Sequence, residues 1–386
     1  MKKHIAILIF VVVFTEVLNA QFQDNFEFRG QASGWFNANS GNTPVWLGAR
    51  YIPQITYRPF QEGRNSIDFE VSANINGSTG FQPAENRTSD GTIKPYRIWG
   101  RYTTSQFEIR MGLQKINFGS AAMLRPLMWF DQVDPRDPLQ LTDGVWGVLA
   151  RYYFINNVNI WLWGLYGNDG PKTWEILESA SNVPELGGRL QIPVPRGETA
   201  LSFHHRKATA TPLFGSGFMG TDDPDLLTGI PENRLGFDGK WDIEIGLWIE
   251  GSYIRKSRNT GIYTNQQILN LGADYTFGIG NGLNVIFEQL LFSYDQNAFA
   301  FRNNHHFTSA ALSYPLGIFD NINTIIYHDW TNGNIYTFLN WQRQYNRVGI
   351  YAMAFWNPDT IRLPQQSEGA QMFSGRGFQL MLVFNH

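Results

Sequence analysis

The chain has 386 residues, of which 43% are hydrophobic, 16% are charged and none is cysteine. An ordinary soluble domain is about 25% charged, whereas a helical membrane protein needs about 20 consecutive apolar residues per span, and no such run follows residue 20. The net charge of -3 gives no electrostatic reason to expect nucleic acid. The lack of cysteine excludes disulfide frameworks and thiolate metal sites. An all-β chain, 15% aromatic, is the class that remains.

Residues 1–20 have the pattern of a cleaved secretory signal peptide. Lys2 and Lys3 precede an apolar run from Ile5 to Phe14, and the segment ends on the small residue Ala20. The apolar run is too short to cross a bilayer. We therefore expect a mature single-domain chain, residues 21–386, outside the cytoplasm.

Apolar and polar residues alternate in several segments, most clearly over residues 107–114, 348–356 and 378–384. Alternate side chains of a strand point to opposite faces, so each such strand has one apolar and one polar face. We predict strands near residues 26–38, 45–58, 66–77, 92–104, 106–116, 145–154, 157–167, 185–193, 198–206, 232–241, 243–256, 262–277, 283–294, 305–315, 322–330, 334–344, 346–357 and 374–385.

Short and long connections alternate between these strands. Thr104-Ser105 and Asn156-Asn157 are tight turns, whereas residues 117–144 and 207–231 are long connections. This pattern is typical of outer-membrane barrels, with short periplasmic turns and long external loops. We predict an all-β, transmembrane, antiparallel up-and-down β-barrel of about 16–18 strands, in the outer membrane of a Gram-negative-type bacterium. The alternative is a soluble sandwich whose apolar faces meet in a core.

The loop at residues 117–144 is the main functional candidate. It is partly apolar, and Pro126, Pro135 and Pro138 stiffen it. We predict that it folds inward and narrows the lumen, and the alternative is an external loop packed on its neighbours. The predicted constriction residues are Arg125, Trp129, Phe130, Asp131, Asp134, Arg136 and Asp137.

The strand pattern also predicts which side chains face the lumen. Rows of arginine and carboxylate on adjacent strands can either line a pore or brace the wall. The predicted lining residues are Asp68, Glu70, Arg97, Arg101, Glu108, Arg110, Gln114, Arg151, Glu244, Glu250 and Glu288.

One block of the sequence carries a family resemblance. The stretch from Arg110 to Gln114, followed by Phe118-Gly119, Pro126, Asp134-Pro135 and Gly144, resembles the strand–loop–strand block of outer-membrane porins. It is nearest the alginate-export-type and related outer-membrane channel group, and the match covers residues 107–154. The resemblance implies a barrel through which small polar solutes diffuse passively. It also implies a pore-lining role for Arg110 and Gln114. The dense arginine complement of a polyuronate channel is missing, so alginate is not carried over as a substrate.

No catalytic or metal site is predicted. Ser202 and His204 share a strand face but lie about 6.5 Å apart, too far for a direct hydrogen bond. We therefore expect no enzyme activity, no catalytic residue, no metal and no cofactor. The expected partners are outer-membrane lipid and small polar solutes, namely ions or oligosaccharides, with no nucleic acid. Two alternatives stay open: a homo-oligomer, and a non-transporting envelope barrel that binds or assembles with a partner.

Overall fold

The computed structural model describes residues 25–41, 43–82, 87–209, 229–361, 363 and 370–386. The expected signal peptide, residues 1–20, lies outside the described residues. Two short 3-10 helices occur in the described part, η2 (Gly261–Thr264) and η3 (Ala370–Phe373). No helix in this part is long and apolar enough to span a membrane.

The rest of the architecture is a single antiparallel sheet. Its strands are β1 (Phe26–Asn39), β2 (Val45–Glu62), β3 (Asn65–Phe81), β4 (Thr88–Thr103), β5 (Phe107–Gln114), β6 (Val145–Tyr153), β7 (Asn159–Leu165), β8 (Glu178–Ser179), β9 (Glu185–Val194), β10 (Gly197–Thr209), β11 (Ile230–Asp242), β12 (Gly246–Lys256), β13 (Asn265–Phe277), β14 (Leu283–Asp295), β15 (Asn303–Pro315), β16 (Asp320–Asp329), β17 (Asn334–Gln344), β18 (Val348–Trp356) and β19 (Arg376–Asn385).

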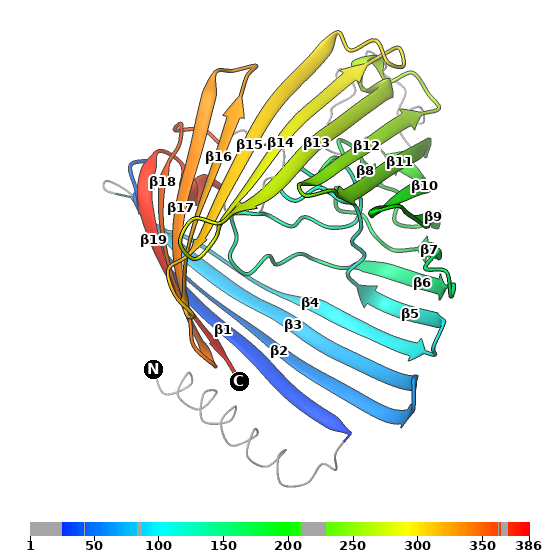
Figure 1. Cartoon of the computed structure of the whole chain (residues 1–386), viewed down its shortest axis with the longest axis horizontal. Coiled ribbons are helices and arrows are strands. Elements are labelled where there is room, and N and C mark those ends of the chain that lie inside the picture. The colour runs from blue at the N-terminus through cyan, green and yellow to red at the C-terminus, as the bar shows by residue number, and fades with distance from the viewer. Residues whose placement is uncertain (1–24, 42, 83–86, 210–228, 362, 364–369) are drawn as a thin grey trace.

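The sheet closes on itself. Each long strand pairs with its neighbour in the chain, and β1 pairs with both β2 and β19, as Figure 1 shows. The two-residue strand β8 pairs with β10 at its loop end, so β7 and β9 are neighbours in the wall. The result is a closed barrel of eighteen strands, which confirms the predicted fold class and strand number.

The alternating sequence sorts side chains between the two faces of the wall. In β19, Leu380 and Leu382 are 49% and 59% exposed on the outer face, whereas the alternating residues Met381 and Val383 are 6% and 3% exposed. Large apolar side chains are exposed in the same way along many other strands, for example Leu201, Leu235 and Phe287. An apolar outer band around a more polar interior is the pattern of a barrel that crosses a lipid bilayer.

Loop lengths differ between the two ends of the barrel. Residues 104–106 and 195–196 are short turns at the end where β1 begins and β19 finishes. The long connections, such as residues 115–144 between β5 and β6, leave from the opposite end. In Figure 1 this β5–β6 segment runs across the space enclosed by the strands.

Candidate functional site in the barrel interior

The β5–β6 loop is bound to the far side of the barrel by two buried carboxylates. Glu250 on β12 and Glu288 on β14 are both fully buried. Counted around the ring of long strands, β14 lies eight strands from β5, almost diametrically opposite. The loop therefore spans the lumen, and these two side chains provide one part of its attachment.

Glu250 binds both ends of one loop segment. Its Oε2 accepts the backbone N–H groups of Ser120 and Ala121 at 2.7 and 2.8 Å, and its Oε1 accepts that of Leu127 at 2.6 Å. Gly119 allows this approach, because its φ is +110° and an added Cβ would lie 2.5 Å from the Glu250 carboxylate. A glycine is required where the backbone has this conformation and comes so close to another group.

Glu288 binds the residues between those contacts. It accepts the N–H groups of Ala122 at 2.7 Å and Leu124 at 2.6 Å, and lies 3.1 Å from that of Met123. The indole of Trp248 donates to the same carboxylate at 3.0 Å. Several N–H donors that converge on one carboxyl group fix the loop segment to β14. We call the two carboxylates and the loop amides they accept the carboxylate clamp.

Apolar side chains complete the attachment of the loop. Trp129 and Phe130 are buried against Phe118 of the loop and against side chains of β6 and β7 such as Trp163, and the Trp129 indole donates to Ser252 Oγ at 3.0 Å. A second cluster joins Leu124 and Met128 of the loop to the inner faces of β13–β18. These contacts fill part of the interior with packed side chains from the loop and the wall.

The charged residues of the loop are largely paired with one another. Arg125 donates to Asp131 at 3.1 Å, and Arg136 to Asp134 at 2.6 Å, so these four side chains are buried in pairs rather than projecting from the loop. Asp137 instead accepts the N–H groups of Leu139 and Leu141. Burial raises the pKa of the Asp137 carboxyl above its ordinary value, and these hydrogen bonds offset part of that rise.

The predicted wall residues of β3–β6 form an arginine-rich network. Arg101 pairs with Asp68 at 2.8 Å, and Glu108 lies 3.4 Å from both Arg110 and Arg151. The guanidinium of Arg151 lies 3.9 Å from the ring centroid of Trp161. This network borders the lumen between the loop and the short-turn end.

The other predicted residues of this wall have different contacts. Arg97 donates to the carbonyl of Thr142 in the loop at 2.9 Å. Gln114 is fully buried and donates to the carbonyls of Arg110 and Gly147. Glu70 is only partly buried and lies in β3 on the same face as Asp68.

The structure corrects one predicted wall residue, Glu244. The sequence pattern places it inside a strand facing the lumen, but β12 begins only at Gly246. Glu244 is exposed in the short turn between β11 and β12, with a φ of +86°. Ile243 and Ile245 extend the apolar–polar alternation of β12 into the turn, so the sequence pattern predicts a strand that begins too early.

A buried ion cluster was missed by sequence reasoning. Glu232 on β11 binds Arg206 at 2.7 Å and Arg234 at 2.8 Å, and Lys256 lies 3.5 Å away. Glu175, from the β7–β9 connection, pairs with both arginines. The strand alternation of β10–β12 places these side chains on one face, and it is the signal that could have found them.

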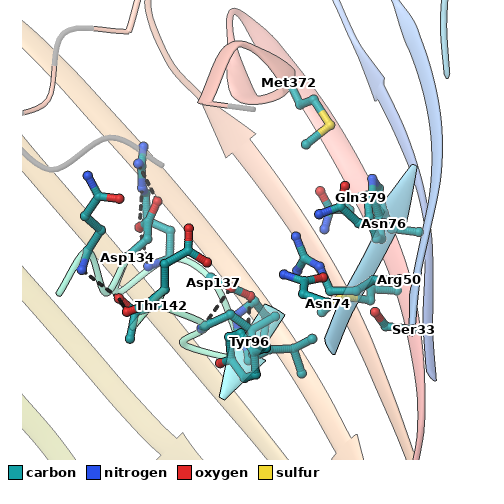
Figure 2. Close-up of a pocket in the computed structure, with 18 of the residues that line it drawn as sticks. Ser33, Arg50, Asn74, Asn76, Tyr96, Asp134, Asp137, Thr142, Met372 and Gln379 are labelled. Carbon is teal, nitrogen blue, oxygen red and sulfur yellow. Dashed lines mark hydrogen bonds and ion pairs between the residues drawn. The ribbon is translucent and has the colours of Figure 1, made fainter. Parts of the chain in front are cut away.

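A polar cavity of about 160 Å³ lies beside the loop and is shown in Figure 2. One side is loop residues 132–143, including Asp134, Arg136 and Asp137. The other side is the inner face of β1–β4 and β19, including Arg50 and Asn74. We call this cavity the eyelet. None of the wall residues predicted from the sequence lines the eyelet. The same strand alternation could have predicted that Arg50 and Asn74 face the lumen.

A second cavity of about 360 Å³ lies beside the inner faces of β14–β18. Asn284, Asn323 and Asn340 contribute polar side chains to it. Both cavities are lined by the segment Arg136–Pro138 of the loop. Solvent-accessible space is therefore present on both sides of this segment.

Groups of three or more acidic or histidine side chains with metal-binding geometry do not occur among the described residues. Ser202, considered above beside His204, accepts a hydrogen bond from Arg189 at 3.1 Å. His204 lies against Glu185 at 3.0 Å and Trp163 at 3.2 Å.

A closed eighteen-strand barrel, apolar outside and crossed inside by a bound loop, is a porin fold. No protein-family model and no curated protein matches the sequence. Solved outer-membrane porins do share the fold. OccD3 of Pseudomonas aeruginosa is 10% identical with a TM-score of 0.57, over 94% of this chain and 91% of that one. OccK7 of the same species is 10% identical with a TM-score of 0.55, over 95% and 99%. OccAB2 of Acinetobacter baumannii is 12% identical with a TM-score of 0.54, over 95% and 98%.

Proposed function

We propose that this protein is an outer-membrane porin, a channel through which small polar solutes diffuse passively. The observation that carries the proposal is the polar eyelet between a loop bound across the lumen and the inner wall of a closed barrel. The apolar outer band supports a position in a lipid bilayer. The fold shared with solved porins supports the outer membrane as that bilayer.

The route for solutes runs beside the β5–β6 loop. A solute entering from the long-loop end meets the eyelet first, passes Asp137 and Pro138, and reaches the cavity beside β14–β18. The arginine-rich network of β3–β6 then borders the way to the short-turn end. Rings of charged and polar side chains at a narrow point set what such a channel admits.

The loop acts as the constriction of this channel. The carboxylate clamp supports this role, because a loop bound at both sides of the lumen keeps its position against thermal motion. Asp134, Arg136 and Asp137 line the eyelet directly, whereas Trp129 and Phe130 hold the loop to the wall.

The charges around the eyelet balance. Its cationic side chains are Arg50, Lys94 and Arg136, and its anionic ones are Asp134, Asp137 and Asp143, three of each. Because a balanced constriction has little net field, we expect weak ion selectivity. Kinship with the alginate-export-type group rests on the Arg110–Gln114 motif and its loop, and alginate itself is not proposed as the solute.

Conductance in planar lipid bilayers tests the proposal. Purified protein should give stable openings whose conductance rises with salt concentration. A folded barrel that inserts without any openings would contradict the channel, and would favour an envelope barrel that acts by binding a partner.

A further inference from the structure

The wall side of the eyelet carries a row of polar side chains set by strand register. Ser33 on β1 pairs with Arg50 on β2, and Arg50 pairs with Asn76 on β3. Asn74, two residues earlier on β3, points to the same face and pairs with Lys94 on β4. Figure 2 shows Ser33, Arg50, Asn74 and Asn76 together on one side of the cavity.

Several of these groups have unused hydrogen-bonding capacity. Asn74 is only 4% exposed, yet its Oδ1 accepts no hydrogen bond from the described residues. The buried Nε of Arg50 and the indole Nε1 of Trp35 also have no partner among them. Buried polar groups are normally satisfied, so unmatched donors and acceptors around one cavity indicate a site that a polar ligand completes.

The loop side of the eyelet offers one further charge. Asp134 is paired with Arg136, and Lys94 with Asp143 at 2.7 Å. Among the described residues, the Asp137 carboxylate accepts hydrogen bonds only from backbone N–H groups, and Arg50 makes no ion pair. A ligand in the eyelet therefore meets one guanidinium, one carboxylate and several amides, which together have no net charge.

Aromatic surface adjoins these polar groups. The indole of Trp35 lies across Gly48, where an added Cβ would collide with the ring. The guanidinium of Arg50 lies 5.7 Å from the Trp35 ring centroid, and Tyr96 also lines the cavity. Apolar ring surface beside amides, a guanidinium and a carboxylate suits a molecule with both C–H faces and many hydroxyls.

We infer that the eyelet is a binding site for a neutral polyhydroxylated solute, a mono- or disaccharide, on its way through the channel. This inference rests on the proposed channel function. Hydroxyl groups both donate and accept, so one sugar can donate to Asn74 Oδ1 and Asp137 while accepting from Arg50. A simple anion would be attracted by Arg50 but repelled by Asp137, and a simple cation the reverse, so neither gains a net electrostatic attraction. An apolar solute would leave the amides unsatisfied.

Single-channel recording with added maltose or glucose tests the site. Each sugar should reduce the ion current of the wild-type channel reversibly and with saturation. A polyethylene glycol of equal hydrodynamic size should reduce it only in proportion to concentration. The Asn74→Ala variant should raise the half-saturating sugar concentration roughly three- to tenfold, the loss expected for one neutral hydrogen bond. Trp35→Ala should raise it as well.

Asn304→Ala is the matched control, because Asn304 is exposed at the long-loop end, outside the eyelet. It should leave sugar block as in the wild type. Folding of each variant is checked by gel electrophoresis, because a folded barrel changes its electrophoretic mobility when it is heated. The sugar site would be overturned if the wild type shows no saturable block, or if both eyelet variants are blocked like the wild type. Neither result would contradict the channel function. A wild-type barrel without ion current in sugar-free salt would overturn the channel, and the sugar site with it.

Discussion

The carboxylate of Glu288 accepts the backbone N–H of Leu124 at 2.6 Å, although the two residues are 164 positions apart in the chain. This contact joins β14 to a loop that leaves the wall between β5 and β6. Together with Glu250 it turns an otherwise external connection into an internal element of the barrel. The width of the proposed passage therefore depends on two side chains of the opposite wall.

Replacing Glu288 by Gln should release part of the loop. The carboxylate of Glu288 accepts loop N–H groups on both oxygens, whereas a carboxamide has only one acceptor oxygen. Its NH2 group is a donor, so some of the loop N–H groups would lose their acceptor. Losing these contacts should cost about 1–3 kcal/mol of loop attachment. We expect noisier and larger single-channel currents, and faster proteolysis within residues 115–144. Glu62→Gln, exposed at the end of β2, makes the same chemical change away from the lumen. Equal conductance and protease resistance in the two variants would show that the loop stays in place without this carboxylate.

Gly119→Ala should disturb the same clamp from the loop side. The added methyl would enter the space of the Glu250 carboxylate, and alanine tolerates a φ of +110° poorly. We expect a loss of about 1–3 kcal/mol in thermal or denaturant unfolding, with current noise like that of the Glu288 variant. Gly278→Ala is the control, because nothing lies within 4 Å of its added Cβ. If both alanine variants behave like the wild type, the close approach of Gly119 and Glu250 does not matter for the loop.

Arg151→Gln should shift ion selectivity towards cations. Arg151 is partly exposed to the lumen beside Glu108, and removing its charge leaves that carboxylate less compensated. We expect the cation-to-anion permeability ratio to rise roughly twofold at low salt and less at high salt, because mobile ions screen the field. The reversal potential in a potassium chloride gradient measures this ratio. Arg347→Gln changes an exposed arginine in the turn between β17 and β18 and should leave the ratio unchanged. A shift towards anions would contradict the proposed lumenal position of Arg151.

Acidification should reduce cation permeability through Asp137. Its raised pKa means that the carboxyl gains a proton at a higher pH than an ordinary aspartate, and it is neutral below that pH. As pH falls towards the ordinary value of about 4, the eyelet therefore loses a negative charge before exposed aspartates do. Reversal potentials recorded between neutral and acidic pH measure this change in cation permeability. The Asp137→Asn variant should lack the part of the change that occurs at the higher pH values. Asp242→Asn, exposed at the end of β11, should leave the pH profile of the reversal potential as in the wild type. An unaltered pH profile in Asp137→Asn would assign the change to other groups.

The strands of the barrel could be predicted because alternation is a local property. The apolar positions of β19 are visible in the sequence from Phe378 to Phe384, and the structure places them on the outer face. The error at Glu244 has the same origin. An alternating pattern cannot show that the chain turns before Gly246, since Ile243, Glu244 and Ile245 of the turn continue the apolar–polar alternation of β12.

The site was only partly predictable, because its geometry depends on what faces each residue across the lumen. Alternation places Glu250 and Glu288 on the inner face of their strands, but it does not distinguish a carboxylate that lines water from one that binds loop amides. The pairing of Arg125 with Asp131, and of Arg136 with Asp134, likewise depends on how the loop folds.

The sequence by itself determined a membrane barrel of about eighteen strands. The two-residue period of a strand and the lengths of its connections are local properties that can be read directly from the order of the residues. Only the tertiary structure decided that Arg50, Asn74 and Asp137 share one cavity. Those residues come from two wall strands and a loop, and their distances exist only once the sheet has closed and the clamp has brought the loop across it.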